Sequence, residues 1–264
     1  MNTALTPFHL VKPSIWPFFS SLFTMSFLMN MAITFHYKSA NSVSLILMSF
    51  FFLVWSAGSW WFDVSIEGFK GGYHTKKVRL GLRMGMALFI VSEVMFFFSF
   101  FWAFFASSLA PVFNIGGVWP PVGITVISPW SIPLFNTFVL LTSGVTITYS
   151  HHAIQQNDNE IVLSGFILTL FFAIIFTLTQ LKEYYDSSFT ISDSVYGSLF
   201  FLMTGFHGVH VFIGTCFILV CFVRYAFGHF SRYYHFGFEA AIWYWHFVDV
   251  VWIFLFLCLY WWGS

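Results

Sequence analysis

Seven long apolar runs constrain this chain more than any other feature of its sequence. They cover residues 16–36, 42–62, 80–107, 131–152, 159–182, 194–224 and 237–262. At about 1.5 Å of rise per residue, each run is long enough to cross the roughly 30 Å hydrocarbon core of a bilayer as a helix. A helix satisfies its own backbone hydrogen bonds inside lipid, so runs of this kind favour helices. The sequence therefore predicts an all-α integral membrane protein with seven transmembrane helices.

The composition agrees with this class, because 59% of the residues are hydrophobic and only 8% are charged. Soluble globular chains carry about 25% charged residues. No connection between runs is longer than roughly two dozen residues, so residues 1–264 are expected to form a single transmembrane domain. The first 15 residues hold one lysine and no arginine, and no cleavable targeting segment is expected there. Cys216, Cys221 and Cys258 lie in apolar runs and resemble small buried hydrophobes rather than metal ligands or disulfide partners.

The distribution of basic residues predicts the orientation of the chain. Seven spans place the two ends on opposite sides of the membrane. Eight of the ten basic residues fall on the side of the N-terminus, namely Lys12, Lys70, Lys76, Lys77, Arg79, Arg83, Arg224 and Arg232. Only Lys38 and Lys182 fall on the other side. The positive-inside rule then predicts that the N-terminus faces the matrix or the cytoplasm.

Glu93 is the one ionisable residue near the middle of the third apolar run. An ionised carboxylate at that depth costs about 3 kcal/mol on insertion scales, so Glu93 should face protein, water or a polar part of a lipid. An intramembrane carboxylate is a functional-site hypothesis by default. The structural alternative is a protonated Glu93 that is hydrogen-bonded to a neighbouring helix.

Two connections between the runs have unusual compositions. Residues 63–79 contain Gly71-Gly72, which should end a helix, and a basic cluster beside the bilayer surface. This cluster could attract anionic headgroups or simply enforce the topology. Residues 108–130 carry no charge at all, so we expect this connection to be covered by headgroups or by a partner.

Hydroxyl and small side chains in the fourth run predict close helix packing. They are Thr142, Ser143, Gly144, Thr146 and Thr148. Small residues let two helix backbones approach, and hydroxyls can form hydrogen bonds across the interface. These residues are therefore assigned to packing rather than to catalysis.

Histidines and carboxylates on the last two runs suggest a metal site that we weigh against a structural role. His207 and His210 are spaced i, i+3, as are His246 and Asp249, with Glu239 further back on nearly the same face. A binuclear carboxylate–histidine centre is one interpretation. Polar side chains that link helices and headgroups are the other, which we favour because no Glu-x-x-His pair recurs on two helices. No metal site is therefore predicted.

Other chemistry finds no support in the sequence. The adjacent His151 and His152 end the fourth run and should lie at the interface. There is no phosphate loop, nucleophile elbow or nucleic-acid patch.

A set of motifs resembles the cytochrome c oxidase subunit III family nearly from end to end. The motifs are Trp60-Trp61-x-Asp63, Gly81-Leu-Arg83-x-Gly-Met, Ser92-Glu93-Val, Phe101-Trp-Ala-Phe, Ser107-Ser-Leu-Ala-Pro111, Trp119-Pro-Pro, Ser150-His-His152, Thr190-Ile-Ser-Asp-x-Val-Tyr-Gly197, Thr204-Gly-Phe-His-Gly-x-His210, His235-Phe-Gly-Phe-Glu-Ala-Ala and Trp243-Tyr-Trp-His-Phe-Val-Asp-Val-Val-Trp252. Several of these motifs are long and unusual, so a chance match does not explain them.

The resemblance implies a fold, partners and a location. Helices one and two would stand apart from a bundle of helices three to seven, with phospholipids in the cleft between them. The chain would hold no cofactor, because haem and copper belong to subunits I and II. It would pack against subunit I of the respiratory cytochrome c oxidase (complex IV) and support its proton uptake and stability. It would lie in the mitochondrial inner membrane with the N-terminus in the matrix.

The resemblance also assigns residues. Glu93 matches the buried carboxylate of the family, and the chain would have no catalytic residue of its own. The positions that match lipid-contacting residues are Trp61, Glu67, His74, His210, Arg224 and His235. Phe62 and Ile66 stand where mitochondrial relatives often carry arginines, and Tyr73 replaces a histidine. One headgroup contact in the cleft is therefore expected to be rearranged, or to be served by Lys70, Lys76 or Lys77.

Three functions remain to be compared. The first is an accessory subunit that belongs to an enzyme only as part of a proton-translocating oxidase complex. The second is a proton- or solute-coupled transporter that uses Glu93, although the chain shows no convincing internal repeat. The third is a haem- or quinone-binding redox protein that uses the histidine pairs.

Overall fold

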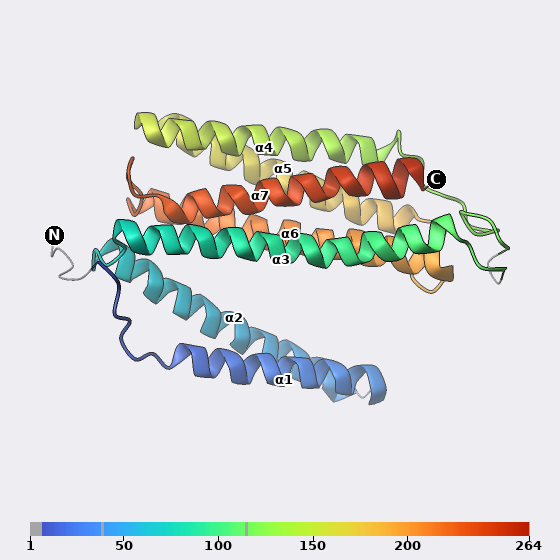
Figure 1. The fold of residues 1–264 in the computed structure, drawn as a ribbon, viewed down its shortest axis with the longest axis horizontal. Coiled ribbons are helices and arrows are strands. Elements are labelled where there is room, and N and C mark those ends of the chain that lie inside the picture. Colours follow the sequence, from blue (N-terminus) through green and yellow to red (C-terminus); the bar gives the residue numbers. More distant parts are fainter. Residues whose placement is uncertain (1–6, 38–39, 114–115, 264) are drawn as a thin grey trace. The chain divides into compact units, whose positions relative to one another are not determined.

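Seven long helices make up most of the chain, as the sequence predicts (Figure 1). The computed structural model describes residues 7–37, 40–113 and 116–263. The helices are α1 (Trp16–Tyr37), α2 (Ala40–Phe69), α3 (Lys76–Leu109), α4 (Ile132–Gln156), α5 (Asn159–Asp186), α6 (Ser194–Ala226) and α7 (Phe236–Leu255). All seven are long and apolar enough to cross a membrane. The prediction of an all-α protein with seven spans is confirmed.

Most helices extend a few residues past the apolar runs that predicted them, and the ends of α2 and α7 differ the most. Helix α2 runs to Phe69, beyond the predicted end at residue 62, so Glu67 lies on a helix rather than in a loop. It ends before Gly71 and Gly72, and Gly72 has a φ of 64°, a backbone conformation that favours glycine. At its other end, α7 continues into a π-helix, η2 (Phe256–Trp262), where one α-helix was expected. Hydropathy marks the apolar part of a helix, and helices extend past that part.

The chain divides into two compact units, one ending at Leu82 and the other beginning at Arg83. The first unit holds α1, α2 and the first turns of α3. The resemblance placed helices one and two apart from the rest, and this grouping agrees, although the boundary falls inside α3. The lipid that the resemblance places between the two groups stays a prediction, as does the single domain.

In the first unit, α1 and α2 pack against each other through small and aromatic side chains. Ser20 Oγ donates a hydrogen bond of 3.1 Å to Ser56 Oγ, and the rings of Phe23 and Phe52 stack with their centroids 5.3 Å apart. Helix α1 has no buried residue. Its apolar side chains therefore require contact with acyl chains or another protein.

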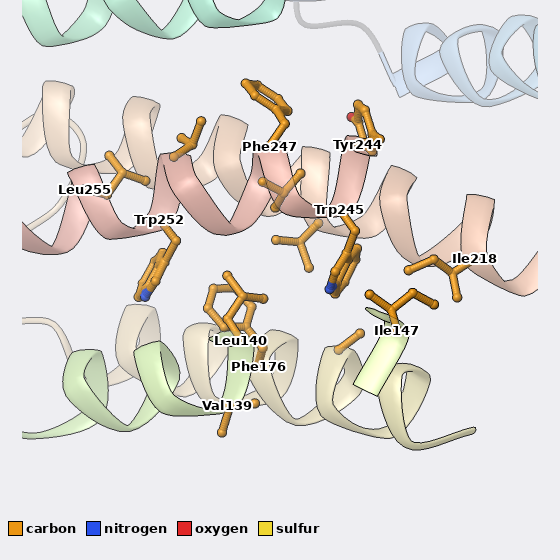
Figure 2. Close-up of a cluster of buried hydrophobic side chains, with 14 of the residues drawn as sticks. Val139, Leu140, Ile147, Phe176, Ile218, Tyr244, Trp245, Phe247, Trp252 and Leu255 are labelled. Atoms are coloured by element: carbon orange, nitrogen blue, oxygen red, sulfur yellow. The ribbon is translucent and has the colours of Figure 1, made fainter. Parts of the chain in front are cut away.

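The second unit has a core between α7 and the pair α4 and α5 (Figure 2). Trp245 and Trp252 point from α7 toward Leu140 of α4 and Phe176 of α5, and all four side chains are buried. Each indole N–H has an acceptor in α4: Trp245 donates to Ser143 Oγ at 2.9 Å, and Trp252 donates to Oγ1 of Thr137 at 3.0 Å. Large rings can be buried here because their polar atoms are satisfied.

Helices α4 and α5 approach closely, as the hydroxyls of the fourth run predict. A Cβ atom added at Gly165 of α5 would collide with Ser150 Oγ of α4. The hydroxyls of Thr146 and Thr169 lie 2.7 Å apart across the same interface. Thr142 is an exception, since it is exposed and donates to the backbone of its own helix.

The uncharged connection before α4 packs partly on the bundle itself. The ring of Trp119 lies 5.6 Å from that of Phe104 and 5.5 Å from that of Tyr196. Phe113 and Val122 remain 97% and 79% exposed. The sequence predicts cover by headgroups or a partner for the whole connection, and the exposed apolar residues of its described part still need that cover.

Candidate functional site

Glu93 of α3 is paired with His210 of α6. The Nε2 atom of His210 lies 2.8 Å from Oε2 of Glu93, between two helices of the second unit. The Glu93 side chain is 22% exposed, so the carboxylate expected to be buried is half-buried. The ring of Phe97 lies 5.0 Å from the imidazole, and that of Tyr244 lies 6.3 Å from it. The alternative interpretation of Glu93, a carboxyl group bonded to a neighbouring helix, matches this geometry.

The contacts of His210 determine how many protons the pair holds. Its Nδ1 atom lies 2.6 Å from the carbonyl oxygen of Phe206, which can only accept, so Nδ1 carries a hydrogen. A hydrogen bond between Nε2 and the carboxylate then requires one more proton, held either by Glu93 or by a charged imidazole. In this geometry one proton is shared between Glu93 and Nε2 of His210, in a largely apolar surrounding.

The other predicted histidines lie in separate places. His207 is buried and donates from Nε2 to the carbonyl of Val248 at 3.2 Å, with its ring against Trp252. His246 contacts Thr148 at 3.1 Å and Asp249 at 3.4 Å. Neither joins the three-residue group of metal-ligating side chains that the described residues contain. The binuclear centre considered from the sequence is therefore not assembled.

That three-residue group lies at the ends of α4 and α7 and consists of His151, His235 and Glu239. His235 Nε2 lies 3.5 Å from Oε1 of Glu239, and the rings of His151 and His235 have their centroids 5.4 Å apart. Arg83 of α3 binds both carboxylate oxygens of Glu239, with the shortest contact 2.7 Å long. This group was not predicted from the sequence, although the seven-span topology places its three residues and Arg83 at the same side of the membrane.

The headgroup candidates of the first unit gather around the N-terminal segment. His9 Nδ1 lies 3.8 Å from Oε2 of Glu67, and its ring stacks on Tyr73 at 4.8 Å and meets His74 edge-on at 6.4 Å. Trp61 is 70% exposed. The sequence analysis did not single out His9, since a histidine before the first span carries no motif. Tyr73, noted as a departure from the family pattern, packs against it.

Arg224 belongs to the second unit and lies in the last turn of α6. Its guanidinium carbon is 4.6 Å from the ring centroid of Phe230. A Cβ atom at Gly237 would lie 2.8 Å from Nη1 of Arg224, so the glycine lets the guanidinium approach the chain. Its Nε atom is buried without a hydrogen-bond partner among the described residues. A partly buried cation of this kind can bind an anionic group.

A second carboxylate, Glu183, was not expected to be buried. It lies near the end of α5 at 3% exposure and accepts hydrogen bonds from Tyr260 at 2.5 Å and Gln180 at 3.0 Å. Gln180 in turn accepts from Asn136 of α4 at 3.4 Å. These residues form a polar link between α4, α5 and η2.

These features define a polytopic α-helical membrane protein in which charged and imidazole groups pair between the helices. The model of the cytochrome c oxidase subunit III family matches residues 6–264. A cytochrome c oxidase subunit 3 of Canis lupus is 51% identical over 257 residues, which cover 97% of both chains. Subunits 3 of Arabidopsis thaliana and Drosophila melanogaster are each 51% identical over 97% and 98% of this chain, and over 97% of their own length.

The chain therefore belongs to the cytochrome c oxidase subunit III family, which confirms the resemblance seen in its motifs. As a subunit of an oxidase, it works in a complex with other oxidase subunits.

Proposed function

We propose that the chain is an accessory subunit of the mitochondrial respiratory cytochrome c oxidase and carries no redox cofactor of its own. It lies in the inner membrane with its N-terminus in the matrix and packs against subunit I. It holds structural phospholipids and supports the proton uptake and stability of subunit I during oxygen reduction. The observation that carries the proposal is the pairing of Glu93 with His210 in a chain of the subunit III family.

The Glu93–His210 pair suits a supporting role in proton supply. The pair holds one exchangeable proton, and its carboxylate is 22% exposed, so it can exchange that proton with its surroundings. Both partners sit on long membrane-spanning helices rather than on loops, which fixes their distance. Such a group can hold a proton near a partner subunit without taking part in oxygen reduction itself.

The test replaces Glu93 in the assembled oxidase. In Glu93→Gln the amide can still donate to Nε2 of His210, so the contact between α3 and α6 is kept and only the acidic proton is lost. We expect the complex to assemble and reduce oxygen, with slower proton uptake or a shorter active lifetime. Glu160→Gln, at the exposed first turn of α5, is the matched control. Complete loss of oxygen reduction in an assembled Glu93→Gln complex would contradict an accessory role.

The same preparations test the alternative functions. Proton-coupled solute transport by the isolated chain in vesicles, abolished in Glu93→Gln, would favour the transporter. A haem spectrum of the isolated chain would favour a redox protein.

Phospholipid binding is supported by the charged and aromatic groups at the membrane surface. Trp61, Glu67 and His74 lie in the first unit, which also holds Lys70, Lys76 and Lys77. Cations near the membrane surface attract headgroups at about 1 kcal/mol each. Arg224 offers a partly buried guanidinium in the second unit. His210 and His235 are 8% and 6% exposed, which favours contacts within the protein over headgroup contacts at these two positions.

Lipid mass spectrometry on the purified complex tests this part of the proposal. We expect His74→Leu and Arg224→Gln each to retain less phospholipid than the parent complex. His36→Leu is the control, because His36 is exposed in the last turn of α1, at the end of the helix away from the N-terminal segment. Equal lipid content in all four complexes would contradict headgroup binding by these residues.

A further inference from the structure

The group formed by His151, His235 and Glu239 has the chemistry of a metal site. One ligand atom from each residue lies within 4.8 Å of the other two. Two imidazoles and one carboxylate form a ligand set that zinc uses, with water at the fourth position. His235 caps the start of α7 and Glu239 lies in its first turn, four residues later, so the two side chains can meet, and His151 comes from α4.

The hydrogen bonds of His235 prepare it as a ligand. Its Nδ1 atom lies 3.0 Å from the carbonyl oxygen of Ser231, so Nδ1 carries the hydrogen and Nε2 keeps its lone pair. A backbone carbonyl that holds the other ring nitrogen is the usual support of a metal-bound histidine. Nε2 itself is buried, points toward Glu239 and has no hydrogen-bond partner among the residues described. A buried ring nitrogen without a partner is costly, and a cation would remove that cost.

The distances are also close to those of a coordinated ion. Ligands about 2.1 Å from a tetrahedral zinc ion are separated from one another by about 3.4 Å. His235 Nε2 and Glu239 Oε1 already lie 3.5 Å apart. His151 is partly exposed at the last turns of α4, and its ligand atom lies within 4.8 Å of both, so binding an ion requires its ring to turn toward them.

Charge sets a limit on the affinity of this site. Arg83 binds both oxygens of Glu239 and balances its charge, and the exposed His152 lies beside His151 with ring centroids 6.2 Å apart. A carboxylate has about four lone-pair positions, so Oε1 can accept from Arg83 and still bind a cation.

We infer that His151, His235 and Glu239 form a binding site for Zn²⁺ at the end of the bundle where α4 finishes and α7 begins. The ion would clamp α4 to α7, while Glu239 would keep its ion pair with Arg83 of α3. Zn²⁺ has no redox chemistry, so the site is compatible with a subunit that carries no redox centre. It does not depend on the proposed roles in lipid binding or proton supply.

The test measures zinc binding to the purified oxidase complex after treatment with a chelator. Equilibrium dialysis against ⁶⁵Zn²⁺ compares the parent complex with His151→Gln, His235→Gln and His152→Gln. We expect both ligand variants to lose about one zinc equivalent that the parent binds. The control, His152→Gln, should keep it, because this neighbouring histidine is outside the group. The zinc that the parent binds and the ligand variants lose should show nitrogen ligands at about 2.0–2.1 Å in the X-ray absorption difference between the two complexes.

Equal zinc content in the parent, His151→Gln and His235→Gln complexes would overturn the inference. Loss of the same equivalent in His152→Gln would contradict the assignment of ligands. If His235→Gln does not assemble because His235 is buried, zinc binding to the His151→Gln complex tests the inference alone, since His151 is partly exposed.

Discussion

Tyr260 donates a hydrogen bond of 2.5 Å to Oε1 of Glu183, which joins the π-helical end of the chain to α5. Both side chains are buried, at 2% and 3% exposure. Gln180 is the other donor to this carboxylate, and Oε2 has no hydrogen-bond partner among the described residues. Burying a carboxylate costs free energy unless hydrogen bonds compensate, so each of these two donors should contribute to stability.

The first prediction removes the hydroxyl of Tyr260. Tyr260→Phe keeps the ring that packs against Trp252 and Phe200 but leaves Glu183 with one donor. The expected cost is about 1–2 kcal/mol in the free energy of unfolding, the upper part of the range for hydrogen bonds inside membranes. Detergent titration of the purified complex measures it. Tyr185→Phe is the control, because Tyr185 is 91% exposed, and equal stability of the two variants would contradict the role of the hydrogen bond.

The second prediction concerns the contact of α4 with α5. In Gly165→Ala the new Cβ would collide with Ser150 Oγ and lie 2.9 Å from the carbonyl oxygen of Thr146. The helices must separate to accept the methyl group, at an expected cost of about 1–3 kcal/mol. The same titration measures the change. Gly205→Ala should be neutral or stabilising, because a Cβ there meets nothing within 4 Å and alanine favours a helix.

Much of the fold could be predicted because a transmembrane helix is a local feature. Each apolar run satisfies its own backbone hydrogen bonds, so its length alone indicates a span. The end of α2 could not be predicted in this way, since the helix continues through Glu67 after the apolar residues stop. Gly71 and Gly72 mark the true end more closely than hydropathy does.

The pairing of side chains was less predictable than the helices. Glu93 and His210 are 117 positions apart, and their contact depends on how α3 and α6 are rotated. In helices that are apolar on nearly every side, periodicity does not indicate which face is buried. Glu183 was missed for another reason: it lies near Lys182 and Asp186, so it looked like part of a polar helix end.

The third prediction concerns the core. Trp245 is fully buried and donates to Ser143 Oγ, so Trp245→Phe loses a hydrogen bond and leaves a cavity. We expect a loss of about 1–3 kcal/mol in the free energy of unfolding. The control is Trp102→Phe, since Trp102 is 69% exposed on α3. If both substitutions lowered stability equally, the core position of Trp245 would not explain its effect.

The fourth prediction concerns Arg83, which competes with a cation for Glu239. Arg83 is 45% exposed, so its ion pair with Glu239 should contribute no more than about 1 kcal/mol to stability. Its charge nevertheless repels a divalent ion bound to the same carboxylate. In Arg83→Gln we expect Zn²⁺ to bind more tightly by about 1 kcal/mol, or about fivefold in Kd. Zinc titration of the purified complex measures this change.

Lys182→Gln is the control: it removes one charge from the exposed end of α5 and should leave the affinity for Zn²⁺ unchanged. Weaker zinc binding in Arg83→Gln would show that Arg83 holds Glu239 in place for the ion rather than competing with it.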